Sequence, residues 1–174
     1  MKKAIFFTII LGVFFSCSHQ KSSNSKGLEI SPGIYVLDSK KPIKTLDELT
    51  HILKGTPIYI DRWATWCSPC IEEFRFKKPL RRFLDGHHIN LVYLNADENI
   101  QPSKYHEFIK SHDLRGYHLR LNPALKNDLV DRGVFIPIIP QYIIMSNNGK
   151  VITNKALRPS DGDSLYAQLK NFIK

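Results

Sequence analysis

Short apolar runs alternate with polar segments along residues 27–174, and their spacing predicts strands alternating with helices. Residues 27–38 hold two apolar groups around Ser31-Pro32-Gly33, which predicts a small hairpin. Residues 57–64 and 89–94 are nearly continuous apolar runs, typical of strands buried on both faces, and residues 116–121 predict a further short strand. Residues 140–145 and 151–156 flank Asn147-Asn148-Gly149, a sequence typical of a hairpin turn.

Helical periodicity fills most of the segments between these strands. Thr45 to Glu48 form a capping box that opens a short helix ended by Gly55. Residues 70–84 predict an amphipathic helix kinked at Pro79, and helices are also expected over 102–112, 122–132 and 161–174. This order predicts an α/β fold with a mixed sheet flanked by helices, in which the early strands pair in parallel and the late hairpin adds an antiparallel edge.

The N-terminus has the pattern of an export signal. Residues 1–16 carry Lys2 and Lys3 before an apolar run of 12 residues, too short for a membrane span of about 20 residues. Ser16-Cys17 resembles a bacterial lipobox, with Phe14 where leucine is usual. We therefore expect an exported protein on the periplasmic side, anchored through a lipid on Cys17 to the cell membrane or the outer membrane. A leader cut elsewhere and an uncleaved anchor remain alternatives.

Removal of this leader leaves a simple domain organisation. Residues 17–26 predict a polar tether, and residues 27–174 are of a size suited to one domain. The formal net charge of +9 raises the question of nucleic-acid binding. Lysine and arginine are spread along the chain without a nucleic-acid-binding motif, so a solvated basic surface is the preferred interpretation and no nucleic-acid partner is expected.

The chemistry is expected at Cys67 and Cys70. They follow a predicted buried strand and open a predicted helix, where backbone N–H groups favour a thiolate. This placement predicts that Cys67 attacks and that Cys70 resolves the mixed disulfide. A structural zinc site would need two further ligands, and a disulfide closing so short a loop would add little stability. A dithiol that handles copper or another metal remains the main alternative.

The run Trp-Ala-Thr-Trp-Cys-Ser-Pro-Cys at residues 63–70 and the run Ile-Pro-Gln-Tyr-Ile-Ile at 139–144 resemble the thioredoxin superfamily. With the lipobox, the early capped helix and Glu73, the chain is similar to the membrane-anchored TlpA/ResA-like branch. The resemblance implies a thioredoxin-like fold with an N-terminal hairpin and helix extension. It also implies an extracytoplasmic enzyme that exchanges thiols and disulfides with proteins, has an upstream electron donor and needs no cofactor, with reduction favoured over oxidation or isomerisation.

The same resemblance implies a substrate site around the dithiol. Pro140 holds the place of a cis proline that packs against the two cysteines, and Ile139 would offer main-chain hydrogen bonds to an extended substrate. Trp66, Ser68 and Pro69 complete the expected substrate-binding set. A trans proline at the start of a strand is the alternative, and Pro137 is a second candidate for the cis bond.

Two acids are candidates for moving a proton. Asp61 interrupts an apolar strand six residues before Cys67, at the place where thioredoxin keeps a buried aspartate that can take the proton of Cys70. Glu73 matches an acid found in ResA-like proteins, although it could simply stabilise the first turn of its helix. Asp61 could instead pair with Arg62 or a lysine. Arg62 is itself unusual in a buried strand, and it could lower the pKa of a thiolate or pair with Asp61 or Glu73.

Two further observations bear on the resemblance. The family usually has a kinking proline where this chain has Arg75, with Pro79 coming later. A copper-binding module would be expected to add a histidine or methionine beside the dithiol, and Met145 is the residue downstream of Pro140 that could be considered. No metal ligand is predicted.

Overall fold

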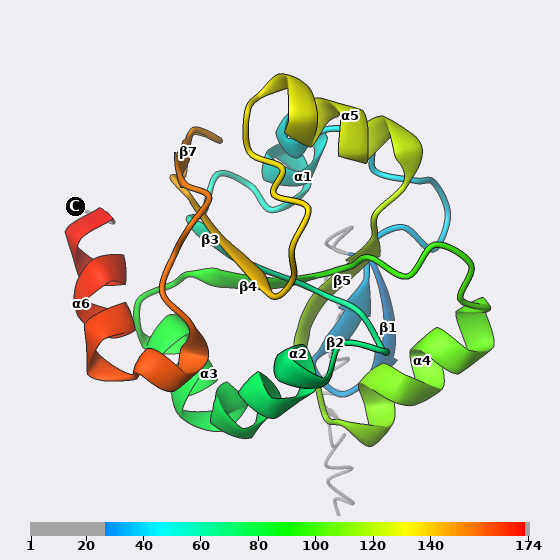
Figure 1. Ribbon diagram of the computed structural model, residues 1–174, viewed down its shortest axis with the longest axis horizontal. Helices are drawn as coiled ribbons and strands as arrows, with labels where there is room; N and C mark the ends of the chain where they lie inside the picture. Colours follow the sequence, from blue (N-terminus) through cyan, green and yellow to red (C-terminus); the bar gives the residue numbers. More distant parts are fainter. Residues whose placement is uncertain (1–26, 173–174) are drawn as a thin grey trace, which may run out of the picture.

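The computed structural model describes residues 27–172, which form one seven-stranded sheet in the order β1-β2-β5-β4-β3-β6-β7 (Figure 1). The four strands β2, β5, β4 and β3 run parallel to one another, whereas the β1–β2, β3–β6 and β6–β7 pairs are antiparallel. Their bounds are β1 Leu28–Ser31, β2 Ile34–Val36, β3 Ile58–Trp63, β4 Asn90–Asn95, β5 Gly116–Arg120, β6 Gln141–Met145 and β7 Val151–Thr153. This mixed sheet confirms the predicted α/β fold with both hairpins.

Helices cover both faces of the sheet (Figure 1). One face carries α1 (Leu46–Ile52) and α5 (Pro123–Asp131). The other carries α2 (Ser68–Glu73), α3 (Lys77–Gly86), α4 (Pro102–Ser111) and α6 (Asp163–Phe172). Because successive side chains of a strand point to opposite faces, β3 contributes Tyr59 and Trp63 to the core under α2 to α4 and α6, and Ile58 and Ile60 to the core under α1 and α5.

The strand register brings three loops together at one edge of the sheet. Trp63, the last residue of β3, pairs with Asn95, the last residue of the parallel strand β4. The neighbouring Arg62 pairs with Gln141, the first residue of the antiparallel strand β6. The loops that follow β3 and β4 and the segment that precedes β6 therefore meet at this edge, which the cysteines occupy.

The helix predicted over residues 70–84 differs from the structure. It is divided into α2, a 3₁₀ turn over Phe74–Phe76, and α3, and it begins at Ser68. Pro79 lies in the first turn of α3, where a missing N–H costs nothing because that group has no partner inside the helix. The irregular turn therefore comes before the proline, and the prediction of a kink at Pro79 was wrong in position.

The start of α1 follows the predicted capping pattern in part. The Thr45 hydroxyl accepts a hydrogen bond from the Glu48 backbone N–H at 3.1 Å, as expected. The Glu48 carboxylate accepts from the backbone N–H of Lys44, one residue before the cap, at 2.7 Å. The side chains of Thr45 and Glu48 therefore each accept a backbone N–H group at the start of α1, and the helix begins where the sequence predicted.

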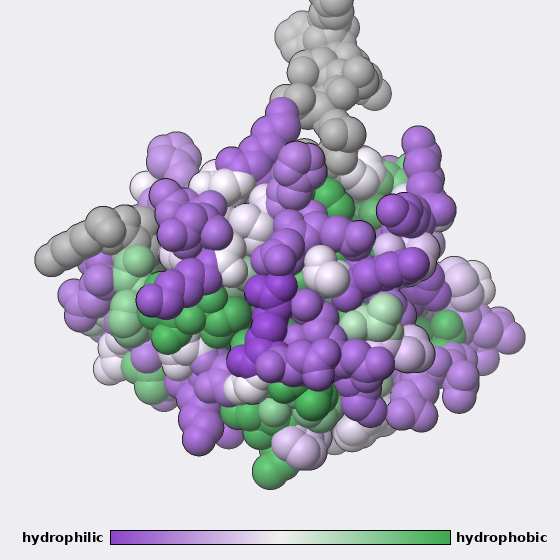
Figure 2. All heavy atoms as spheres, turned by 90° about the horizontal axis from the view of Figure 1, so that it is seen from above, coloured by the Kyte–Doolittle hydropathy of each residue, from purple (hydrophilic) through white to green (hydrophobic). Residues whose placement is uncertain are grey.

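Apolar side chains are scattered in small groups over the face that Figure 2 shows, and most of that face is hydrophilic. Small separate groups of this kind are ordinary for a globular protein. The two large apolar residues with the highest exposed fractions are instead Ile138, at 74%, and Trp66, at 69%. Both lie in the segments that meet at the cysteine edge of the sheet, so this edge offers apolar surface to a partner.

Candidate active site

The two cysteines stand where β3 passes into α2. Cys67 is the residue that caps α2, and its Sγ accepts a hydrogen bond from the backbone N–H of Cys70 at 3.3 Å. The two sulfurs form a disulfide, with the Cα atoms 5.3 Å apart. Pro69 occupies the first turn of the helix, where its fixed backbone angle suits the helix start. The local sequence therefore places both sulfurs at the helix N-terminus, as predicted.

Both cysteines are largely buried in this disulfide form. Cys67 is 4% exposed and Cys70 is 1% exposed, while their neighbours Trp66, Ser68 and Pro69 are exposed. Cys67 is thus the more accessible of the two, but by a small margin. A partner thiol can reach it only by close docking against the exposed residues around it.

Asp97 fixes the loop before Cys67, a role that sequence analysis missed. Its carboxylate accepts hydrogen bonds from the Thr65 backbone N–H at 3.0 Å and from the Thr65 hydroxyl at 2.9 Å. The Asn95 side chain donates a further hydrogen bond to it at 2.6 Å. Asp97 follows β4, so these contacts tie the loop after β3 to the loop after β4. The signal in the sequence was an Asn-Ala-Asp run at the end of a predicted strand.

The segment before β6 lies on the other side of the dithiol loop. The Ile139–Pro140 peptide bond is cis, as predicted, and within residues 27–172 no other proline, Pro137 included, has a cis bond. Ile139 lines a pocket together with Trp66, the residue immediately before Cys67. The sequence-predicted residues Trp66, Ile139 and Pro140 are therefore brought together, although they lie more than 70 positions apart.

Asp61 lies on the same face of the sheet as α2. It is 3% exposed, and its Oδ1 has no hydrogen-bond partner. Burial, and then the nearby charge of Glu73, raises the pKa of Asp61 well above its ordinary value of 3.8. The pKa values of Tyr93 and Tyr142 are also raised, by burial first and then by the charge of Asp61. A buried carboxylate whose pKa is raised in this way is a stronger base than an ordinary carboxylate.

Glu73 is buried as well, at 7% exposure, but its carboxylate is engaged. It accepts hydrogen bonds from the backbone N–H of Ser160 at 2.9 Å and from the Ser160 hydroxyl at 2.8 Å. These bonds connect α2 to the 3₁₀ turn over Pro159–Asp161. Sequence analysis missed Ser160, because nothing in the local pattern relates it to a residue 87 positions earlier.

Arg62 points to the opposite face from Asp61, because the two residues are consecutive in a strand. The alternative in which Arg62 pairs with Asp61 or Glu73 is therefore wrong. Its Nη2 donates hydrogen bonds to the carbonyl oxygens of Ile136 and Ile138 in the segment before Pro140. Burial lowers the pKa of Arg62 to about 10, which leaves the guanidinium charged at neutral pH.

The residues considered for metal binding are not gathered at the dithiol. Met145 pairs with Ile58 at the far end of the β3–β6 ladder, opposite to the cysteine edge. Within residues 27–172, no three side chains of histidine, cysteine, aspartate and glutamate stand close enough together to hold a metal ion.

The predicted anchor falls outside the described part of the chain. Cys17, the leader over residues 1–16 and the tether over residues 17–26 all precede residue 27. Within the described residues, no helix is both long enough and apolar enough to cross a membrane.

Comparison with known proteins finds relatives that are thiol-disulfide oxidoreductases. No family model matches the chain. A thiol-disulfide oxidoreductase ResA of Bacillus cereus is 30% identical over 172 residues, which cover 98% of this chain and 87% of that protein. Thiol-disulfide oxidoreductase ResA of Bacillus subtilis (strain 168) is 26% identical over 174 residues, covering 98% and 86%.

Solved structures agree with these relatives. A solution structure of a candidate thiol-disulfide oxidoreductase from Bacteroides vulgatus matches with a TM-score of 0.56 and 31% identity, covering 70% of this chain and 78% of that one. The thioredoxin domain of a second Bacteroides vulgatus oxidoreductase matches with a TM-score of 0.57 at 21% identity, covering 71% and 84%, and supports the fold alone. The chain belongs to the ResA family of thiol-disulfide oxidoreductases within the thioredoxin superfamily.

Proposed function

We propose that this oxidoreductase reduces disulfides of proteins outside the cytoplasm through Cys67 and Cys70. The observation that carries the proposal is the disulfide at the start of α2, with Cys67 the less buried partner and with exposed residues around it. Trp66, Ser68, Pro69, Ile139 and Pro140 form the substrate contact surface in this proposal. Reduction is favoured over oxidation or isomerisation because the TlpA/ResA-like branch that the chain resembles mostly reduces.

The reaction proceeds by two exchanges of a sulfur–sulfur bond. The Cys67 thiolate of the reduced enzyme attacks the substrate disulfide, which forms a mixed disulfide and releases one substrate thiolate. Cys70 then loses its proton to a nearby base and attacks Cys67, which releases the second substrate thiolate and leaves the Cys67–Cys70 disulfide. Two electrons have passed to the substrate, and a dithiol donor upstream restores the reduced enzyme.

Asp61 is the proposed proton acceptor in the second step. Its carboxyl is buried on the face that α2 covers and has an oxygen without a hydrogen-bond partner. Glu73 is the second candidate, but its carboxylate oxygens are already engaged by two hydrogen bonds from Ser160.

The direction of electron flow is tested by the reduction potential of the Cys67–Cys70 couple. Equilibration of the full chain with dithiol buffers should place it more negative than about −200 mV, in the range of reducing members of the superfamily. A value near about −120 mV, like that of a strong oxidant, would reverse the proposed direction.

The roles of the cysteines are tested by trapping. Cys70→Ser should accumulate mixed disulfides with substrate proteins, because the resolving thiol is absent, while Cys67→Ser should not. The reverse pattern would exchange the two roles. For the copper-handling alternative, neither variant traps protein and both lose copper affinity together, which a copper titration of the reduced forms measures.

We also propose export and a lipid anchor on Cys17, supported by the charged and apolar leader and by Ser16-Cys17. Labelled fatty acid should enter the wild-type chain in bacterial cells but not Cys17→Ala. Equal labelling of both would leave a conventional signal or an uncleaved leader as the explanation.

A further inference from the structure

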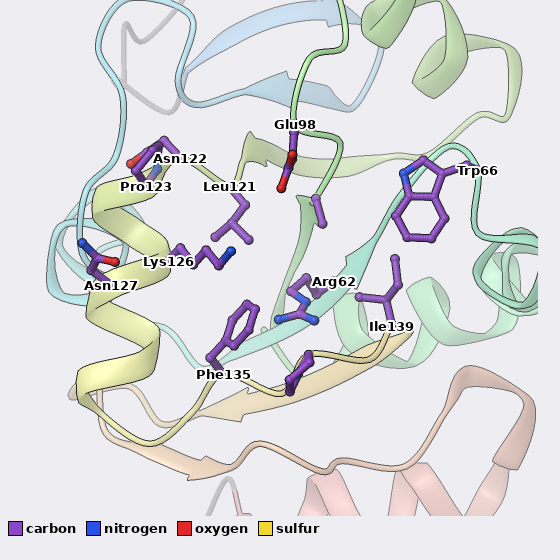
Figure 3. A pocket seen from close by; sticks show the side chains of 12 residues that line it. Arg62, Trp66, Glu98, Leu121, Asn122, Pro123, Lys126, Asn127, Phe135 and Ile139 are labelled. Carbon is purple, nitrogen blue, oxygen red and sulfur yellow. The ribbon is translucent and has the colours of Figure 1, made fainter.

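A pocket of about 550 Å³ opens beside the dithiol loop, on the face of the sheet that α5 covers (Figure 3). Trp66 and Ile139 form the wall nearest the cysteines, since they directly precede Cys67 and Pro140. Lys126 of α5 and Phe135 form the opposite wall, and the side chain of Arg62 lies between the two walls (Figure 3). A group held in this pocket would therefore sit next to a substrate bound at Cys67.

Arg62 presents unused hydrogen-bond donors in this pocket. Its side chain is among the largest fully buried ones, and the residue is 2% exposed. Nη2 donates to the two carbonyl oxygens of the segment before Pro140, but Nε and Nη1 have no hydrogen-bond partner. A buried cation with unpaired donors is costly unless an anion or an acceptor satisfies them. The guanidinium of Arg62 can therefore donate hydrogen bonds to a ligand from outside the chain.

A second cation stands near the first. The guanidinium carbon of Arg62 lies 4.4 Å from the centroid of the Phe135 ring, and Nζ of Lys126 lies 5.5 Å from the same centroid. Glu98 is the acid among the lining residues, and it is exposed. The ion pairs found within residues 27–172 do not join Glu98 to either cation. The pocket therefore keeps an excess of positive charge.

We propose that this pocket binds a carboxylate side chain of the polypeptide whose disulfide the enzyme exchanges, and so selects substrates with an acidic residue near the reactive cystine. A carboxylate oxygen can accept a charge-assisted hydrogen bond from the free Nη1–H group of Arg62, and Lys126 adds a second positive charge. The walls formed by Trp66 and Ile139 link the pocket to the proposed substrate surface. The inference rests on the proposed function, since it names the substrate class of that same site.

Three kinds of cystine peptide of equal length test the proposal with the full chain. The first kind carries a single glutamate, placed at a different position near the cystine in each peptide of the series. The second kind has glutamine at that position, and the third has glutamine at that position and a glutamate at the far end of the peptide. The third peptide has the same net charge as the first, so it separates the pocket from general attraction to a chain of charge +9. We expect kcat/KM for the best-placed glutamate to exceed the other two by about tenfold.

Single-residue variants test which side chains produce the preference for the well-placed glutamate. Lys126→Gln, on the exposed side of α5, should reduce this preference several-fold without affecting the fold. Arg62→Met should abolish the preference if the variant remains folded. Glu98→Gln should strengthen it, since it removes the competing charge. Lys150→Gln is the matched control, because Lys150 is exposed and follows β6 at the end of the sheet away from the cysteines, so the preference should stay as in the wild type.

The outcomes distinguish the inference from the function on which it rests. Equal rates for all three peptides, or a preference that Lys150→Gln reduces as much as Lys126→Gln does, would overturn the carboxylate pocket while leaving the reductase intact. Failure to reduce any of the peptides at a measurable rate would overturn the proposed function and the pocket with it.

Discussion

The carboxylate of Glu73 accepts two hydrogen bonds from Ser160, a residue 87 positions further along the chain. The contact joins the helix that carries Cys70 to the turn that leads into α6. It also bears on the chemistry, since the contact fixes the position of the Glu73 carboxylate, whose charge adds to the effect of burial in raising the pKa of Asp61. Glu73 thus acts on Asp61 through space while being held in place itself.

Ser160→Ala removes one of these two bonds and should destabilise the protein by about 1 kcal/mol, because an acceptor on a buried carboxylate loses its donor. Urea unfolding of the disulfide form measures the change. Ser164→Ala is the control, because Ser164 is exposed on α6. Equal stability of the two variants would show that the Ser160 hydroxyl contributes nothing to the hold on Glu73.

Asp61→Asn keeps the shape of the side chain but removes the proton acceptor proposed for the resolving step. Attack of Cys70 on the mixed disulfide should slow by about 10²–10⁴-fold if Asp61 is a general base. The initial attack by Cys67 should change much less. Rapid mixing at pH 5 to 9, with the mixed disulfide formed first, separates the two steps.

Glu73→Gln is the companion variant for that experiment. Since its carboxylate is occupied by Ser160, we expect resolution to slow less than it does in Asp61→Asn. A defect confined to Glu73→Gln would transfer the role to Glu73, and wild-type rates in both variants would remove carboxylate-assisted resolution from the mechanism.

The parts of the site that the sequence predicted are those encoded by local pattern. Cys67 and Cys70 lie three residues apart at a strand-to-helix junction, Pro140 stands directly before an apolar strand, and Asp61 is a lone acid in an apolar run. Each of these signals lies within one element and its nearest neighbours. The order of strands and helices was predictable for the same reason, since hydrophobic periodicity is a local property.

The parts that the sequence did not predict depend on contacts between distant segments. Asp97 meets Thr65 across 32 positions, and the pocket beside the dithiol gathers residues from β3, α5 and the segment before β6. Arg62 shows the reverse case, because a pairing with its neighbour Asp61 was left open as an alternative although strand geometry places the two residues on opposite faces. The division of the helix after Cys70 was missed because an apolar period persists across the 3₁₀ turn.

Asp97→Ala should loosen the loop that carries Cys67. Two hydrogen bonds from Thr65 and one from Asn95 lose their acceptor, which should lower the free energy of unfolding by about 1–3 kcal/mol. The free energy of unfolding of Asp97→Asn, which retains one acceptor oxygen, should lie between those of the wild type and Asp97→Ala. Asp131→Ala, at an exposed position, is the control. Urea unfolding measures all four proteins, and an unchanged Asp97→Ala would show that the loop is held by other contacts.

Asp61→Asn should also stabilise the protein, and by an amount that grows with pH. In the unfolded chain Asp61 loses its proton near the ordinary value of 3.8, whereas in the fold its pKa lies well above that value. Between the two values folding must take up a proton, so wild-type stability falls as pH rises through this window, by up to about 1.4 kcal/mol for each pH unit. Asparagine does not titrate, so the advantage of the variant is smallest below pH 3.8 and largest above the folded pKa.

Urea unfolding of both disulfide forms across this range measures the difference, with Asp131→Asn as the control at an exposed position. A difference that stays constant with pH would mean that Asp61 is ionised in the folded protein, and the buried acid could then not deliver a proton on the return step.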